Sequence, residues 1–337
     1  MNKVKLTGAE IIWECLLREQ VNVVFGYPGG AILPTYDALS KYSDRIHHVL
    51  TRHEQGATHM ADGYARSSGK VGVALATSGP GAANMVTGLA TAMMDSVPIV
   101  CITGQVPRPA IGSDAFQEMD ISGAVIPVTK HSYLVMDIKD LAKTIKEAFV
   151  IARSGRPGPV LVDIPKDLQA EEFDFVYPEE PIMLPGDNPI KNDIDVKSLE
   201  EAAKLIANAE RPVILAGHGI LLSGASKEVI ELSEKGDIPL SWTLLGSGAV
   251  PASHDLNMGM MGMHGEFAAN NAIQKADLLI ACGMRFDDRV TGNTKTYSLN
   301  SKKIHIEIDP SEINKNVPVD IALVGDLREV LRKLLPI

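Results

Sequence analysis

Short apolar runs alternate with helix-like stretches through the first half of the chain. The runs cover residues 23–25, 48–50, 71–76, 99–103 and 160–164. Near the start, Thr7 and Glu10 fit a capping box, and apolar residues at helical spacing follow them. Buried strands that alternate with helices are typical of a parallel sheet that carries helices on both faces.

The second half repeats this alternation after an irregular middle segment. Its predicted strands cover residues 213–216, 278–281, 303–308 and 321–324, and its predicted helices cover residues 197–208, 225–235 and 327–335. The middle segment is rich in proline and acidic side chains and has no steady period, which indicates a linker. We therefore predict an α/β protein with two doubly wound parallel-sheet domains, residues 1–168 and 196–337, joined by a linker over residues 169–195.

Composition excludes several classes of protein. The 337 residues are 45% hydrophobic and 22% charged, as in ordinary globular proteins, and the net charge of −10 argues against a nucleic-acid-binding surface. No apolar run is long enough to cross a membrane, and Glu10 and Glu14 interrupt the region where a signal peptide would lie. The three cysteines form no CxxC pair, which favours a reducing compartment, so we expect a cytoplasmic protein. The net charge and the short apolar runs lead us to expect neither nucleic-acid nor membrane partners.

The segment that follows the predicted strand 48–50 contains the first candidate for chemistry. Ligands of open parallel sheets bind beyond the carboxyl ends of the strands, and Glu54 lies just after one such end. The same carboxylate could instead stabilise the start of a helix, and the sequence leaves both readings open. His53 and His59 are six residues apart and so fall on different helix faces, which argues against a metal site.

Glycine-rich turns follow other predicted strands, over residues 26–30, 77–84 and 217–220. Such turns either allow a ligand to approach the backbone or are simply tight turns. Asn84 stands where a dinucleotide fingerprint needs its third glycine, so NAD is not expected. In the second half, arginines and acids follow the strands that end near residues 281 and 308, and their convergence favours a nucleotide-shaped ligand over solvated surface pairs.

Six segments together carry a resemblance to one family. They are FGYPGGAILPTYDAL, RHEQGATHMADGYAR, TSGPGAANMVTGLA, ITGQVPRPAIGSDAFQE, RSGRPGPVLVDIPKD and GMRFDDRVTG. From Thr7 onward the chain resembles the large, catalytic subunit of acetohydroxyacid synthase, also called acetolactate synthase, in its flavin-containing branch. The resemblance implies a thiamine-diphosphate pyrimidine-binding domain, followed by a central domain that holds FAD.

The resemblance also implies an activity. Family members bind thiamine diphosphate, Mg²⁺ and FAD, decarboxylate pyruvate, and join the two-carbon unit to a second 2-ketoacid. The products, acetolactate or acetohydroxybutyrate, feed branched-chain amino acid biosynthesis. Glu54 matches the glutamate that bonds N1′ of the aminopyrimidine and thereby helps to activate the cofactor, which serves as the electron sink.

Further roles are implied position by position. The residues matched to the catalytic centre are Glu54, Gln117, Lys166 and Gly30. Those matched to the thiamine site are Tyr27, Gly29 and Glu54. Those matched to FAD contacts are Arg156, His264, Gly265, Arg285, Arg289, Glu307, Asp309 and Asp326. Those matched to the substrate channel are Pro107, Arg108, Ala115 and Phe116.

One departure from the family qualifies these expectations. Family members have a third domain whose GDG…NN motif holds the diphosphate through Mg²⁺, and no such motif precedes Ile337. The C-terminal diphosphate/Mg domain is therefore expected to be absent, with no metal ligands in this chain and little activity until that domain is supplied. The resemblance further implies a homo-oligomer, either a dimer or a tetramer, and a small regulatory subunit.

Other functions remain open from the sequence. One is a sister thiamine enzyme, such as pyruvate oxidase or glyoxylate carboligase. The carboligase lacks the activating glutamate, so Glu54 argues against it, and residues 283–292 favour the synthase over the oxidase. Another is a non-catalytic flavin-binding or assembly module.

Overall fold

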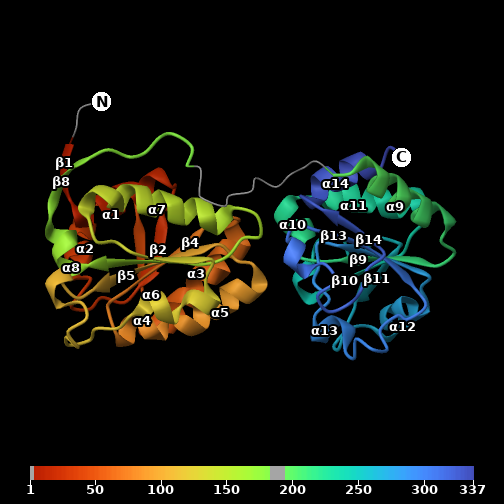
Figure 1. Cartoon of the computed structure of the whole chain (residues 1–337), viewed down its shortest axis with the longest axis horizontal. Coiled ribbons are helices and arrows are strands. Elements are labelled where there is room, and N and C mark those ends of the chain that lie inside the picture. The colour runs from red at the N-terminus through yellow and green to blue at the C-terminus, as the bar shows by residue number, and fades with distance from the viewer. Residues whose placement is uncertain (1–3, 183–193) are drawn as a thin grey trace. The chain divides into compact units, whose positions relative to one another are not determined.

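The computed structural model describes residues 4–182 and 194–337, which fall into two compact units (Figure 1). Within those residues each unit is built on a six-stranded sheet whose neighbouring strands are all parallel. The predicted class of two parallel-sheet α/β domains is confirmed. None of the described helices is both long and apolar enough to cross a membrane.

In the sheet of the first unit, the chain first adds a strand on one side of the starting strand and then adds the remaining strands on its other side, so the direction of growth reverses. Its strands are β2 (Val23–Gly26), β3 (His47–Leu50), β4 (Gly72–Ala76), β5 (Ile99–Gln105), β6 (His131–Leu134) and β7 (Val160–Pro165). Their spatial order is β3-β2-β4-β5-β7-β6. Because β3 and β4 lie on opposite sides of β2, the turns after β2 and β4 border a crevice at the carboxyl edge, where ligands of such sheets bind.

Helices cover both faces of this sheet, as Figure 1 shows. They are α1 (Gly8–Arg18), α2 (Leu33–Ala38), α3 (Glu54–Ser68), α4 (Pro80–Asn84), α5 (Val86–Asp95), α6 (Ile121–Ala124), α7 (Ile138–Arg153) and α8 (Lys166–Ala170). Strand β4 shows why two layers form. Val73 and Leu75 belong to the core beneath α1 and α7, whereas Ala74 and Ala76 belong to the core beneath α3 and α5.

The predicted capping box is confirmed at the start of α1. The Glu10 amide donates to Thr7 Oγ1 at 3.3 Å, and the Thr7 amide donates to a Glu10 carboxylate oxygen at 2.8 Å. The two residues thus satisfy each other's free N–H groups at the helix start.

The first residues of the predicted linker belong to the first unit instead. Strand β8 (Glu172–Phe175) pairs antiparallel with β1 (Val4–Thr7), and α8 extends to Ala170. Gln169, only 1% exposed, donates from Nε2 to the carbonyls of Ala31 and Ile164, both at 2.9 Å. The sequence did not reveal this attachment, because it depends on the single buried amide of Gln169 at the start of a segment that is otherwise acidic and rich in proline. Residues 183–193 of the predicted linker lie outside the described residues.

The second unit repeats the reversal. Its strands are β9 (Pro212–Ala216), β10 (Leu240–Trp242), β11 (Asn257–Met260), β12 (Leu278–Cys282), β13 (Lys302–Glu307) and β14 (Ile321–Val324), in the order β11-β10-β9-β12-β13-β14. Its helices are α9 (Val196–Asn208), α10 (Gly219–Ser223), α11 (Ser226–Gly236), α12 (Phe267–Lys275), α13 (Asp288–Thr291) and α14 (Leu327–Leu334). The reversal lies between β9 and β12. Strands β6, β10 and β11 were missed because none contains an apolar run.

Short 3-10 helices complete the connections. They cover Leu39–Lys41, Arg108–Ala110, Ile126–Val128, Leu244–Gly246 and Pro310–Glu312. The one at Arg108–Ala110 lies directly after β5, in the segment predicted to line a substrate channel.

Replacing Gln169 with leucine should destabilise the first unit. Besides the two carbonyls, Gln169 Oε1 accepts from Thr35 Oγ1 at 2.9 Å, so the change leaves three buried groups unsatisfied. We expect a loss of about 2–4 kcal/mol. Urea unfolding monitored by Trp13 fluorescence in a Trp242→Phe background reports on this unit alone.

Glu172→Gln in the same segment is the matched control. Glu172 pairs with Lys5 at 2.9 Å, but the two side chains are 59% and 66% exposed, so no measurable change is expected. Equal urea midpoints for the Gln169 and Glu172 variants would show that Gln169 does not anchor the segment.

Candidate functional site

Glu54 is the first residue of α3 and lies at the carboxyl edge of the first sheet. Glu54 is 7% exposed, and Asn84 Nδ2 donates to its Oε2 at 2.9 Å. Oε1 has no hydrogen-bond partner among the described residues, and a Cβ added at Gly81 would lie 3.2 Å from it. The structure therefore holds one carboxylate oxygen in place and leaves the other available to a ligand that donates a hydrogen bond.

The turn after β2 packs directly against the turn after β4. The Ala31 amide donates to Thr77 Oγ1 at 3.0 Å, and a Cβ on Gly29 would lie 2.5 Å from Thr77 Cγ2. Only glycine allows this approach. Gly30 has open space where its Cβ would be, and the Tyr27 residue is 42% exposed. The predicted turn residues thus lie at the crevice that Glu54 borders.

Gln117 contacts the same glycine-rich turn from another loop. Gly79 has a φ of +56°, and a Cβ there would lie 2.5 Å from the Gln117 carbonyl oxygen. Gln117 itself has a φ of +59°, a conformation that a non-glycine residue keeps only where its surroundings enforce it. Next to it, Phe116 is 88% exposed. The structure therefore brings Gln117, Gly29 and Glu54 to one edge of the sheet.

The remaining candidates of the first unit lie along the loops after β5 and β7. Lys166 begins α8 and is partly buried, with no polar partner among the described residues. Arg108 donates to Asp167 and Glu171, both at 2.7 Å, so its guanidinium fastens the predicted channel segment to α8. In that segment Pro107 is exposed and Ala115 is partly buried.

Arg156 makes local contacts after α7. Its Nε donates to Ser96 Oγ at 2.8 Å, and its Nη2 lies 3.4 Å from the Met94 carbonyl oxygen. These contacts hold the loop after α7 against the end of α5. Its predicted flavin contact stays a prediction.

In the second unit, the turns after β9 and β12 touch through glycine. A Cβ on Gly217 would lie 2.2 Å from the Gly283 carbonyl oxygen, and Gly283 has a φ of +58°. Beyond Gly283, the Met284 carbonyl accepts from His305 Nε2 at 2.8 Å and the Phe286 carbonyl accepts from Asn316 Nδ2 at 2.9 Å. These bonds fix the turn, whose Met284 and Phe286 side chains are buried while the intervening Arg285 is partly exposed.

The three acids predicted to contact FAD also shape the loops of this edge. Glu307 Oε1 accepts from the amides of Ile308 at 2.9 Å and Asp309 at 3.3 Å. Asp309 accepts from the Ser311 amide at 2.9 Å, and Asp326 caps α14 by accepting from the Glu329 amide at 3.1 Å. Each carboxylate is thus partly engaged by backbone N–H groups, a local role that its position after a strand did not reveal.

The segment around His264 folds back on the start of α13. The Met263 amide donates to the Arg289 carbonyl at 2.8 Å, and Arg289 Nη1 lies 3.4 Å from Met263 Sδ. Gly265 fits tightly, since a Cβ there would lie 2.4 Å from the Met260 carbonyl oxygen. His264 is exposed. These predicted flavin residues therefore lie in two segments that the structure joins.

Sequence reasoning missed a buried polar cluster beneath the Gln117 loop. Asp163, near the end of β7 and 1% exposed, accepts from Thr103 Oγ1 at 2.7 Å and from Gln105 Nε2 at 2.8 Å. Burial raises the pKa of Asp163 to about 6. The available signal was the presence of polar residues inside otherwise apolar strands.

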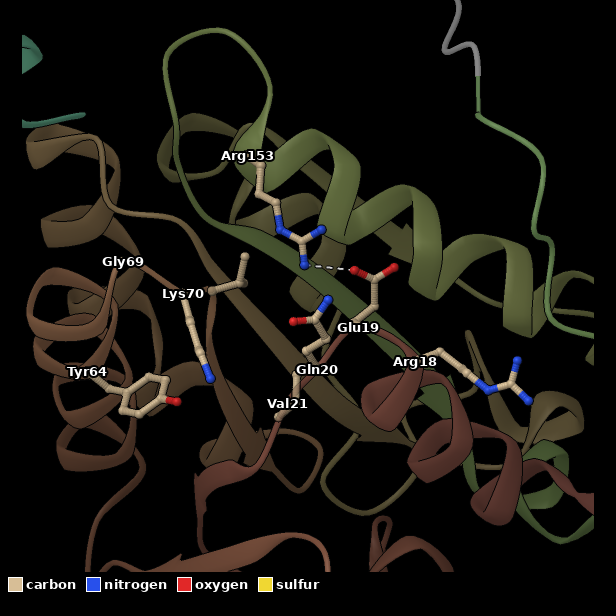
Figure 2. A pocket seen from close by; sticks show the side chains of 9 residues that line it. Arg18, Glu19, Gln20, Val21, Tyr64, Gly69, Lys70 and Arg153 are labelled. Atoms are coloured by element: carbon tan, nitrogen blue, oxygen red, sulfur yellow. Dashed lines mark hydrogen bonds and ion pairs between the residues drawn. The ribbon is translucent and has the colours of Figure 1, made fainter. Parts of the chain in front are cut away.

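A polar cavity of about 200 Å³ lies at the opposite, amino-terminal edge of the first sheet. Figure 2 shows the ion pair across it, in which Arg153 and Glu19 approach to 2.7 Å. Arg18 and Arg153 end α1 and α7, where cations stabilise the carbonyl ends of helices. That role accounts for the two arginines, and the cavity lies away from the carboxyl edge where ligands of such sheets bind, so it is not the candidate site. Among the described residues, no group of three or more histidines, cysteines or acids is placed to hold a metal.

Comparison with known proteins agrees with this geometry. The family model described as "Thiamine pyrophosphate enzyme, N-terminal TPP binding domain" matches residues 6–124, and "Thiamine pyrophosphate enzyme, central domain" matches residues 199–334. The two sheets and their crevices are therefore domains of the thiamine pyrophosphate class of enzymes.

Individual relatives define the group more narrowly. The chain is 52% identical over 334 residues to a probable acetolactate synthase large subunit of Methanocaldococcus jannaschii. The aligned region covers 98% of this chain and 56% of that protein. It is 51% identical to the acetolactate synthase large subunit of Corynebacterium glutamicum, over 98% of this chain and 52% of that protein. The chain is similar to acetolactate synthase large subunits and spans about half the length of these curated relatives.

The buried carboxyl of Asp163 should make stability depend on pH. Its pKa rises from 3.8 to about 6 on folding, so between those values the folded chain binds a proton that the unfolded chain lacks. Stability from this group is therefore greatest at low pH and falls as the pH rises through about 6. Relative to an Asp163→Asn variant, the native protein should be more stable at pH 4.5 than at pH 7 by on the order of 1–3 kcal/mol.

Urea unfolding at the two pH values, followed by Trp13 fluorescence in a Trp242→Phe background, measures this difference. Taking the difference between native and variant proteins cancels the contributions of the other carboxylates. A difference that is the same at both pH values would contradict the assignment of a raised pKa to Asp163.

Proposed function

We propose that this chain forms the thiamine-binding and central parts of an acetolactate synthase catalytic subunit. It would act on pyruvate and a second 2-ketoacid to give acetolactate or acetohydroxybutyrate in branched-chain amino acid biosynthesis. The observation that carries the proposal is the buried Glu54 carboxylate at the sheet reversal. One of its oxygens is held by Asn84, and the other has no partner among the described residues. The named acetolactate synthase relatives support it.

The site fits the pyrimidine end of thiamine diphosphate. When bound, this cofactor supplies the electron sink for decarboxylation of a 2-ketoacid. Glu54 Oε1 would share a proton with a ring nitrogen of the pyrimidine, and Asn84 would keep the carboxylate in the orientation needed. Gly29 and Gly81 keep the turns thin enough for a ring to reach the carboxylate. We assign Gly30, Gln117 and Lys166 to the lining of the substrate space, as the resemblance implies.

The second unit supplies a site for FAD. The glycine turns after β9 and β12 pack closely at a sheet reversal, where ligands of such sheets bind, and Arg285 has no polar partner among the described residues. Arg285 and Arg289 would pair with the phosphates, while the loops held by Glu307, Asp309 and Asp326 would contact the ribose. We assign the contacts with Mg²⁺ and the diphosphate to the region of the relatives that this chain does not cover.

A second copy of the chain completes the catalytic site in this proposal. Large apolar residues are exposed around the carboxyl edge of the first sheet, among them Phe116 at 88%, Leu50 at 64% and Leu33 at 50%. Apolar residues gathered beside a functional edge mark a surface for association. The proposal therefore includes a dimer or tetramer. The small regulatory subunit is carried over from the resemblance, and a cytoplasmic location from the sequence.

The assay for the proposed function uses complementation. The chain is mixed with the region of the Methanocaldococcus jannaschii relative that it does not cover, together with thiamine diphosphate, Mg²⁺ and FAD. Pyruvate should then yield acetolactate, whereas a pyruvate oxidase would yield hydrogen peroxide and acetyl phosphate. A folded complex that forms no acetolactate would overturn the proposal, and retained flavin without turnover would support a non-catalytic flavin-binding module.

Glu54→Gln should reduce turnover in that complex by about 10²–10⁴-fold, because the amide cannot exchange the proton. FAD affinity, measured by flavin fluorescence, should not change. Glu172→Gln, on an exposed ribbon, is the control and should keep full activity. Turnover in the Glu54 variant equal to that of the native complex would remove this carboxylate from the mechanism.

Arg285→Gln should weaken FAD binding by roughly 10- to 100-fold, since a charged donor to phosphate is lost. The measurement is a flavin fluorescence titration of the chain itself, independent of activity. Arg211→Gln, at an exposed arginine of the same unit, is the control and should leave the affinity unchanged. Equal affinities for both variants would place the flavin elsewhere.

A further inference from the structure

The loop that carries Phe116 and Gln117 contains unfavourable backbone geometry. Asp114 has a φ of +56° and Gln117 a φ of +59°, and neither is glycine. Such residues keep these conformations only where surrounding contacts enforce them. One enforcing contact is internal, because Glu118 accepts from the Ala115 amide at 3.0 Å and from the Gly112 amide.

The second contact comes from below the loop, from the buried end of β5. Gln105, 4% exposed, donates from Nε2 to the Met119 carbonyl at 2.8 Å, while its Oε1 accepts from the Val106 amide at 2.9 Å. One side chain therefore holds both ends of the loop over residues 106–119.

Asp163 determines which way the Gln105 amide points. Its carboxylate accepts from Gln105 Nε2 at 2.8 Å and from Thr103 Oγ1 at 2.7 Å. An amide turned by 180° would direct its oxygen at both the carboxylate and the Met119 carbonyl, and its NH₂ group at the Val106 N–H. Only the observed orientation gives each group a complementary partner.

We propose that Asp163 and Gln105 are positioning residues that hold the loop of Phe116 and Gln117 at the thiamine crevice. The proposal deepens the function proposed above, because it concerns the loop that completes that site. Neither residue needs to touch a ligand. Both act through the Met119 carbonyl, two residues from Gln117, whose own carbonyl packs against Gly79 of the glycine-rich turn.

Hydrogen exchange of the chain alone tests the positioning without any activity. The reporters are the amides of Ala115, Glu118 and Ile121, which donate within the loop or to its end. Gln105→Leu and Asp163→Leu should each speed exchange at these amides by roughly tenfold or more, because the anchor is lost. The exchange rates of amides in the central strand β4 should change far less.

Two further variants separate positioning from general destabilisation. Asp163→Asn keeps an acceptor for Gln105 Nε2 and should restore most of the loop protection. Thr103→Val removes the other hydrogen bond to Asp163 but leaves Gln105 in place, so loop exchange should stay within about twofold of the native rate. If Thr103→Val and Asp163→Leu speed exchange equally, or if loop and β4 amides change together, the proposal is wrong.

The complementation assay then connects the loop to turnover. With the loop released, Gln105→Leu should lower kcat/KM for pyruvate at least tenfold while Glu54-dependent cofactor binding is retained. If exchange speeds up only in the loop while kcat/KM for pyruvate stays unchanged, then Gln105 and Asp163 do hold the loop. That result would nevertheless contradict the placement of Gln117 in the catalytic site. If loop amides exchange at the native rate in the Gln105→Leu and Asp163→Leu variants, then these residues do not hold the loop, whatever the activity.

Discussion

The close contact between turns at the reversal of each sheet is the constraint on which both candidate sites depend. In the first unit, Gly29 lies against Thr77, and in the second, Gly217 lies against Gly283. A side chain at either glycine would force the turns apart and would fill the space that a ligand needs. The chain satisfies the same geometric requirement twice, and each time the polar candidates lie on the loops that the contact brings together.

Polar groups inside the first unit serve mainly to hold that edge. Gln169 fixes the turn near Ala31 from one side, and Gln105 with Asp163 supports the loop near Met119 from another. Buried hydrogen bonds of this kind add little net stability when satisfied but are costly to break, so they specify one arrangement of the loops. The catalytic candidate Glu54 differs because one of its oxygens is left for a ligand.

Much of this architecture followed from the sequence, because apolar runs mark buried parallel strands clearly. The capping box of Thr7 and Glu10 was also predictable, since it depends on local spacing. What could not be predicted depends on contacts far apart in the chain. Gln169 binds residues more than one hundred positions away, and Asn84, judged only against a dinucleotide motif, turned out to orient Glu54. The strand β10, with its sequence LSW, is specified by its neighbours rather than by its own pattern.

The small antiparallel ribbon of β1 and β8 has a consequence for how the first unit folds. Because Val4 pairs with Phe175, the two strands close a loop that contains the whole six-stranded sheet of this unit. Pairing residues so far apart in the sequence costs more chain entropy than forming the local strand–helix contacts of the sheet. We therefore expect the ribbon to close after the sheet and the loops around Glu54 have formed.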